Sequence, residues 1–180
     1  MCRRNKLNIF LVIVTSLVCS YVYALSVYKK TGTFPHITGP LLNHHKSIFD
    51  SKSQLGKVWV VVMWSSQENT TDQLNHHWKV LKEISQKYTG MLYGVNYRDS
   101  EKSAINFLDK HGNPFVESIT DKDGKIGIEL NVFQIPEIIV ISKDGEIVYR
   151  HTKFINTNDW EESLEPAIKK AIAAKNSGKD

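Results

Sequence analysis

The pattern of hydrophobic and polar positions predicts alternating strands and helices from about residue 57 onward. Residues 57–63 (KVWVVVM) form a continuous, β-branched apolar run, which is typical of a strand covered on both faces. After it, apolar residues recur at helical spacing from Leu74 to Tyr88, and Gly90 ends the pattern. The same reasoning predicts further strands at 91–97, 115–119, 138–141 and 146–150, and helices at 99–110 and 158–173.

Two prolines mark special positions in this pattern. Pro166 lies inside the last predicted helix, where the missing backbone donor should kink or interrupt it. Pro136 directly precedes the strand at 138–141, and the first position of a strand accepts proline. The order β-α-β-α, insertion, β-hairpin, α resembles the thioredoxin arrangement, which places a cis proline there; an ordinary trans proline is the alternative.

The predicted fold class is therefore α/β, a thioredoxin-like fold in which helices flank a central mixed sheet. At 180 residues and 41% hydrophobic, the chain is long enough for one such domain and a short appendage. We expect the domain at 54–174, an irregular tether at 29–53 and a tail at 175–180.

The appendage is a predicted transmembrane helix within residues 1–28. Residues 7–28 carry no charge and approach the ~20 residues that span a bilayer. Arg3, Arg4 and Lys6 would hold the N-terminus in the cytoplasm and send the domain across the membrane. A signal peptide cleaved after Ala24 is the alternative, and both interpretations export the domain.

Charge and cysteine usage narrow the chemistry of that domain. The net charge of +4 comes from basic residues scattered among acidic ones, so nucleic-acid binding has no support. The two cysteines, Cys2 and Cys19, both lie within the appendage. An exported domain without cysteine has neither an internal disulfide nor thiol chemistry of its own.

Several motifs in register resemble one known family, the membrane-anchored thiol:disulfide interchange proteins of bacterial cytochrome c maturation, within the thioredoxin-like redoxins. The resemblance extends over about residues 55–170 and implies a single-pass protein of the bacterial inner membrane with its domain in the periplasm. The matching pieces are LGKVWVVVMW (55–64), GVNYRDS (94–100), HGNPF (111–115), DKDGKIGIELNVFQIPE (121–137) and KDGEIVYRH (143–151).

The chain departs from this family at the redox motif. Family members carry Trp-Cys-x-x-Cys after the first strand, whereas here Trp64 is followed by Ser65, Ser66, Gln67 and Glu68. Disulfide exchange needs a thiolate and a second sulfur, and serine supplies neither. Ser65-x-x-Glu68 has instead the form of a capping box at the start of the next helix. The alternative is that its carboxylate or backbone amides bind a ligand.

What the resemblance leaves is a surface that binds an extended peptide, without catalytic residues and without a cofactor or metal. Its predicted residues are Trp64, Ser65, Ser66, Gln67, Glu68, Ile135, Pro136 and Glu137. The implied partner is apocytochrome c or another maturation protein. Two alternatives stay open: an active oxidoreductase that uses a thiol from elsewhere, such as Cys19, and a thioredoxin-fold adaptor unrelated to haem proteins.

Other polar motifs are interpreted as structural. The histidine pairs at 44–45 and 76–77 are expected to lie on the surface or half-buried. In the pair at 76–77, adjacent helical positions point about 100° apart and do not share one metal ion easily. His111 and His151 are interpreted in the same way. Residues 121–124 (DKDG) begin like a calcium loop but lack its later ligands, which favours a tight turn.

Overall fold

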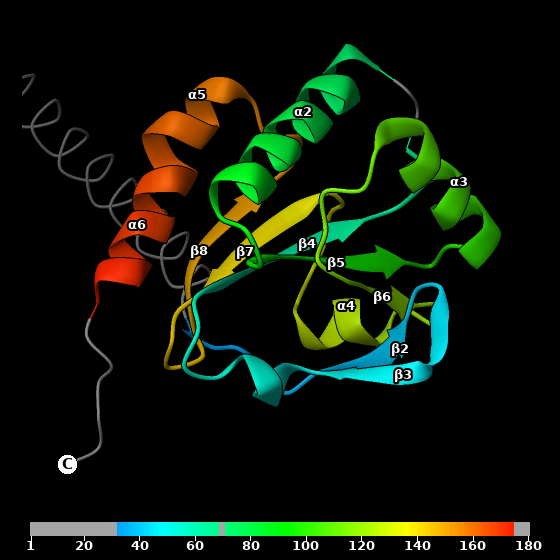
Figure 1. Cartoon of the computed structure of the whole chain (residues 1–180), viewed down its shortest axis with the longest axis horizontal. Coiled ribbons are helices and arrows are strands. Elements are labelled where there is room, and N and C mark those ends of the chain that lie inside the picture. The colour runs from blue at the N-terminus through cyan, green and yellow to red at the C-terminus, as the bar shows by residue number, and fades with distance from the viewer. Residues whose placement is uncertain (1–31, 69–70, 175–180) are drawn as a thin grey trace, which may run out of the picture. The chain divides into compact units, whose positions relative to one another are not determined.

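The computed structural model describes residues 32–68 and 71–174, which build one mixed β-sheet with helices packed against it (Figure 1). The strand order is β1-β8-β7-β4-β5-β6-β2-β3. The strands are β1 (Gly32–Thr33), β2 (Thr38–Leu41), β3 (His44–Asp50), β4 (Trp59–Trp64), β5 (Leu92–Tyr97), β6 (Ser118–Asp121), β7 (Glu137–Ile141) and β8 (Glu146–Thr152). The helices are a 3₁₀ turn (Ser51–Gln54), α2 (Asp72–Lys87), α3 (Glu101–His111), α4 (Lys125–Glu129), α5 (Thr157–Asp159), a π-helical stretch (Trp160–Leu164) and α6 (Glu165–Ala173).

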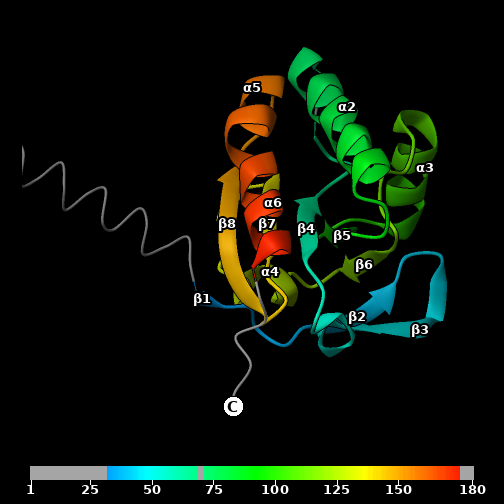
Figure 2. The ribbon, with the colours of Figure 1, turned by 60° about the vertical axis from the view of Figure 1, so that its left-hand side comes forward.

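Strand β4 is the centre of this sheet. It pairs in parallel with β5 and antiparallel with β7, and all six of its residues are buried. Alternate β4 side chains enter two separate apolar clusters. One cluster lies under α2, α3 and α6, and the other lies against α4 and the β2–β3 hairpin (Figure 2). A strand buried on both faces needs no polar alternation, which explains the continuous apolar run in the sequence.

Most predicted elements are confirmed with shifts of a few residues, and the predicted thioredoxin-like architecture is present. The predicted irregularity near Pro166 is also found: the π-helical stretch Trp160–Leu164 gives way to α6, in whose first turn Pro166 lies. Proline is tolerated in a first helical turn, because the backbone N–H groups there have no intrahelical acceptor. One short helix, α4, was not predicted from the sequence.

The expectation of an irregular tether over residues 29–53 is wrong for its described part. Strands β2 and β3 form an antiparallel hairpin there, and Leu41 of β2 pairs with Ile119 of β6. Phe49 of β3 packs against the rings of Trp59 and Tyr93, with centroids 5.9 and 5.5 Å away. The hairpin thus depends on contacts with residues distant in the sequence, which the local pattern does not reveal.

The predicted membrane anchor, residues 7–28, lies outside the described residues. In the parts of the chain that are described, none of the helices combines the length and the apolar character needed to span a bilayer.

Candidate functional site

The two segments predicted to form the docking surface leave the sheet at the same edge. The antiparallel register of β4 and β7 pairs Met63 with Glu137, so the loop after Trp64 lies beside the loop before β7. Strand β5 runs parallel to β4, with Asn96 opposite Trp64, and its following loop reaches the same edge. Three loops therefore meet at the candidate site.

Trp64 lies beneath this edge as part of the core. Its side chain is only 1% exposed, and its ring lies 5.6–5.8 Å from those of Trp78, Phe107 and Phe115. The position of Trp64 depends on Gly94 in β5: a Cβ there would lie 2.7 Å from Trp64 Nε1, closer than real contacts allow. Trp64 thus supports the loop at 65–68 from within the core and has almost no exposed surface of its own.

The loop of residues 65–68 is fastened to the loop that follows β5. Asp99 Oδ2 accepts a 2.6 Å hydrogen bond from the Ser66 N–H, and the Gln67 side-chain amide donates to the Arg98 carbonyl at 3.0 Å. Asp99 is itself 5% exposed and accepts from Asn96 Nδ2 at 3.1 Å. The loop at 65–68 is therefore held by residues of the loop after β5, and not only by its own neighbours in the sequence.

The predicted capping box does not form. Ser65 Oγ accepts from the Gln67 N–H at 3.2 Å, and helix α2 begins only at Asp72. Thr71 is the N-cap: its backbone is extended, and its hydroxyl accepts from the Leu74 N–H at 3.1 Å. Threonine is a good N-cap, and Asp72 in the first turn suits the helix dipole, so the helix starts at this later position.

Glu68 is half-buried. Its Oε1 atom is shielded from solvent and has no hydrogen-bond partner among the residues that the structure describes. Desolvation raises the pKa of Glu68 from 4.5 to about 7, because a buried carboxylate loses its hydration. Near pH 7 the site therefore holds a carboxyl group that exchanges between its protonated and charged forms, and not the fixed anion that a capping box would require.

A buried ion pair holds the second segment of the site, the loop around Pro136. The Ile135–Pro136 peptide is cis, and the Pro136 carbonyl accepts from the Lys153 N–H. Glu137 is 3% exposed, and its Oε1 lies 2.6 Å from Nη1 of Arg150. Nη2 of Arg150 donates to the Leu130 carbonyl at 2.7 Å, which joins the loop before Pro136 to strand β8.

The residues that a partner can reach are therefore a subset of those predicted. Gln67 is exposed, and four residues are partly exposed: Ser65, Ser66, Glu68 and Ile135. Pro136 and Glu137 are buried. Phe133, 77% exposed in the loop before Pro136, was not predicted as part of this surface.

Asn96, Asp99 and Arg150 were also missed as supports of the site. Asn96 offered a signal, because a fully buried polar residue inside an apolar strand needs hydrogen-bond partners. Asp99 and Arg150 lie inside the quoted motifs GVNYRDS and KDGEIVYRH, but their contacts span 33 and 13 positions of sequence.

The remaining polar motifs have structural surroundings. Within the described ranges, no cluster of three or more His, Cys, Asp or Glu side chains could hold a metal ion. The Asp121 carboxylate accepts from the N–H groups of Ile126 and Gly127 and so caps α4. The expectation of a surface or half-buried histidine is wrong for His77, which is 1% exposed and accepts from the Ile155 N–H through Nδ1.

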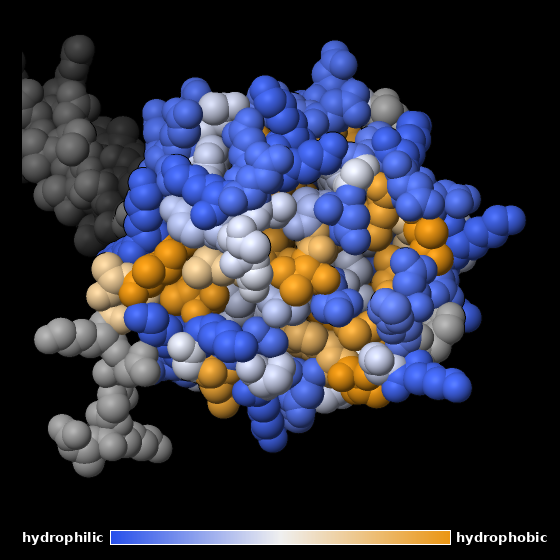
Figure 3. Space-filling model, viewed as in Figure 1, coloured by the Kyte–Doolittle hydropathy of each residue, from blue (hydrophilic) through white to orange (hydrophobic). Residues whose placement is uncertain are grey.

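A cleft elsewhere in the domain contains none of the predicted site residues. It lies where the C-terminal end of α2 meets the start of β5 and the loop at 113–116, and its lining includes Tyr88, Phe115 and Val116. On the face shown in Figure 3, hydrophobic residues form several patches separated by more polar residues.

Comparison with known proteins identifies the protein family to which this chain belongs. The family model described as Redoxin matches residues 29–168. The chain therefore belongs to the redoxin family. Within it, the chain is similar to thiol:disulfide interchange proteins of the DsbE type.

Two relatives illustrate the range of this similarity. The Vibrio cholerae serotype O1 thiol:disulfide interchange protein DsbE is 28% identical over 188 residues, which cover 94% of this chain and 97% of that protein. The Escherichia coli (strain K12) protein of the same name is 40% identical over 77 residues, or 43% of this chain and 42% of the relative. The second similarity is thus stronger but spans less than half of either protein.

Solved structures support the fold. A Chlorobium tepidum protein described as a DsbE-type thiol:disulfide interchange protein superposes with a TM-score of 0.68 at 20% identity, covering 79% of this chain and 97% of its own. A secreted thiol-disulfide isomerase from Corynebacterium glutamicum gives 0.61 at 18% identity, covering 78% and 92%. At these identities the likeness concerns the thioredoxin-like architecture alone.

Proposed function

We propose that this chain is an exported, membrane-anchored redoxin of the DsbE type that binds polypeptides without exchanging disulfides. The observation that carries the proposal is the composition of the docking edge. Ser65 and Glu68 stand in the loop after β4, and residues 20–180 contain no cysteine. Thiol:disulfide exchange requires an attacking thiolate and a resolving sulfur, so the domain has no route to that chemistry.

The retained scaffold supports a binding role. The Asp99 hydrogen bond fixes the loop at 65–68, and the Arg150–Glu137 pair fixes the segment around Pro136. Both contacts hold loops in place and neither depends on a sulfur atom. They can therefore support a binding surface in a chain without the redox cysteines. An edge held rigid before the partner arrives loses less entropy on binding.

We further propose that the bound polypeptide is an extended segment of apocytochrome c or of another cytochrome maturation protein. This proposal rests on the family resemblance of the motifs and on the surface next to Pro136. Ile135 and Phe133 offer apolar contact area, and Gln67 offers polar contacts. Thioredoxin-like folds hold extended peptides by backbone pairing at this edge, with side-chain contacts giving selectivity.

The anchor at residues 7–28 would hold this domain in the periplasm next to the bacterial inner membrane. Its support is the uncharged segment behind Arg3, Arg4 and Lys6.

A peptide-binding measurement with the full chain in detergent tests this function. The probe is a synthetic peptide with a C-x-x-C-H haem-attachment motif, compared with the same peptide carrying serine in place of both cysteines. We expect equal affinity for the two peptides, because no thiol takes part. Binding only of the cysteine peptide, through a mixed disulfide with Cys19, would overturn the proposal in favour of an oxidoreductase.

Variants identify the surface that binds. Phe133→Ala should weaken binding several-fold, whereas the matched control Ile128→Ala, which removes an isoleucine that is 67% exposed on α4, should not. Absence of binding by either peptide would overturn the haem-protein assignment and leave an adaptor with another partner.

A further inference from the structure

Strand β3 forms an open edge of the sheet. It is the last strand in the order and, within the described residues, pairs on one side only, with β2. Figures 1 and 2 both show β3 along the rim of the domain, at the far end of the sheet from β8. Edge strands of this length are templates for further strand pairing unless something blocks them.

The backbone register shows which groups face the open edge. The Ser51 N–H donates to the Ile37 carbonyl, so Ser51 and Ile37 form a hydrogen-bonded pair of the hairpin. Hydrogen-bonded and non-hydrogen-bonded pairs alternate in an antiparallel ladder, which makes Pro40 and Ile48 a non-hydrogen-bonded pair. This agrees with proline having no N–H to donate. The N–H and C=O groups of Ile48 consequently point away from β2, toward the open edge.

The side chains along β3 are complementary to those of a second β3 strand that runs antiparallel to it. Ile48 and Asp50 flank the buried Phe49 and share the exposed face of the hairpin. Lys46 is also exposed and lies two positions before Ile48, where the register with β2 shifts at a bulge. Ile48 is 63% exposed, an unusual position for a large apolar side chain at a strand centre, and it lies between a cation and an anion. If two β3 strands pair antiparallel about Ile48, each Lys46 lies opposite Asp50 of the second copy.

Shifted alignments that keep the same face are less favourable. Pairing centred on Lys46 places two ammonium groups against each other, and like charges directly opposite are destabilising. Pairing centred on Ser47 places Lys46 opposite Ile48 and leaves Asp50 opposite His44. The alignment centred on Ile48 alone combines an apolar pair on the two-fold axis with two opposite-charge pairs.

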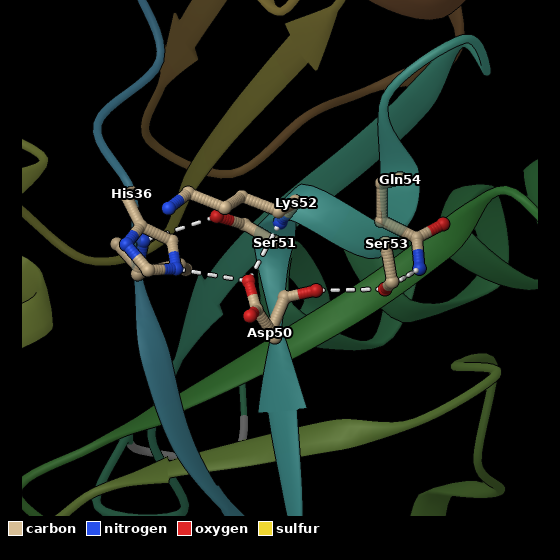
Figure 4. Close-up of polar contacts among 7 residues, drawn as sticks. His36, Asp50, Ser51, Lys52, Ser53 and Gln54 are labelled. Atoms are coloured by element: carbon tan, nitrogen blue, oxygen red, sulfur yellow. Dashed lines mark hydrogen bonds and ion pairs between the residues drawn. The ribbon is translucent and has the colours of Figure 1, made fainter.

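The acidic member of this pattern is held in place within its own subunit. Asp50 Oδ1 accepts from the Lys52 N–H at 2.8 Å and lies 2.9 Å from His36 Nε2 (Figure 4). The hydrogen bond from Lys52 is the main reason that the pKa of Asp50 is lowered, which keeps the carboxylate charged at neutral pH. Its own carbonyl accepts from Ser53 Oγ at 2.7 Å, so the pairing would end at this residue.

We propose that β3 is a self-association site at which a second copy of this chain pairs antiparallel, with Ile48 on the two-fold axis and Lys46 opposite Asp50 of the second copy. The two sheets would then continue into one another. The surface does not include the docking edge around Pro136, so self-association and partner binding are separate properties.

Cysteine cross-linking of the full chain in detergent tests the proposed alignment. With Cys2 and Cys19 changed to alanine, Ile48→Cys supplies a single thiol on the proposed axis, and Ile128→Cys supplies an equally exposed control on α4. Mild oxidation should produce a covalent dimer at least tenfold faster at position 48. Equal rates at the two positions would overturn the proposal, and faster cross-linking by Ser47→Cys would overturn the alignment.

Sedimentation of the uncross-linked chain gives an independent measurement. Lys46→Glu places two carboxylates opposite each other and should weaken the dimer about tenfold, since two attractive surface pairs become repulsive. The matched charge reversal Lys102→Glu on α3 should have no effect. A chain that stays monomeric at all concentrations would overturn the proposal. Ile48→Asp should abolish the dimer but leave binding of the C-x-x-C-H peptide unchanged, which separates this proposal from the proposed function.

Discussion

The buried imidazole of His77 should make the domain sensitive to acid. His77 lies on α2, and its Nδ1 accepts the Ile155 N–H at 3.0 Å, so the neutral ring carries its proton on Nε2. That nitrogen is buried and has no hydrogen-bond partner among the described residues. Desolvation, with a smaller contribution from the charge of His151, lowers the pKa of His77 from 6.5 to about 3. The acidic group beside His151 is Asp159, whose Oδ2 lies 3.8 Å from His151 Nε2.

The magnitude follows from proton linkage. The unfolded chain binds a proton at this histidine near pH 6.5, but the folded domain does so only near pH 3. Stability is therefore fully present above pH 6.5 and is lost as the pH falls toward 3. At ~1.4 kcal/mol per pH unit, the loss is about 2 kcal/mol at pH 5 and approaches about 5 kcal/mol at pH 3. A loss of this size is a substantial part of a typical domain's stability.

Urea unfolding at pH 7 and pH 5 measures this effect. His77→Gln keeps a side-chain oxygen that can accept from the Ile155 N–H but removes the titrating group. The difference in unfolding free energy between the two pH values should shrink by about 2 kcal/mol in this variant. His76→Gln, an exposed neighbour on the same helix, is the control and should leave the difference unchanged. An identical pH dependence in wild type and His77→Gln would refute the reasoning.

Three further predictions concern the supports of the docking edge. Arg150→Met removes the cation that pairs with the buried Glu137 and should lower the free energy of unfolding by about 3–5 kcal/mol, measured with denaturant. Adding Glu137→Gln should recover most of this loss. Additive losses from the two substitutions would contradict the ion-pair account. Gly94→Ala should displace Trp64, seen as a shifted tryptophan emission and reduced peptide affinity, and an unchanged spectrum would count against the contact. Glu68→Gln should stabilise the domain increasingly as the pH rises from 4.5 to about 7, since it removes the burial of a developing charge; equal effects at pH 5 and pH 8 would argue against a raised pKa.

The strands and helices that could be predicted from the sequence are those whose pattern is local. Strand β4 is apolar at every position because it is buried on both faces, and α2 carries an apolar stripe that ends before Gly90. Such signals need no knowledge of distant residues. Trp64 and Pro136, both singled out from the sequence, lie beside loops that leave the sheet at the same edge.

The features that the sequence did not reveal depend on tertiary contacts. The β2–β3 hairpin contains Gly39 and Pro40 and is held by β6 and by the aromatic rings around Phe49. The start of α2 was predicted too early, because Ser65 and Thr71 are both suitable caps and Asp99 ties the earlier segment to another loop. In each case, a contact across many positions of sequence outweighs a local preference.

Complementation of cells depleted of this protein tests the central claim most directly. Membranes from these cells are stained for covalently bound haem after rescue with the natural chain or with Ser65→Cys/Glu68→Cys. We predict that haem staining is lost on depletion and fully restored by the natural chain, because binding at this edge needs no thiol. Restoration only by the double cysteine variant, or staining that depletion leaves unchanged, would contradict the claim that this redoxin serves cytochrome maturation without its own dithiol.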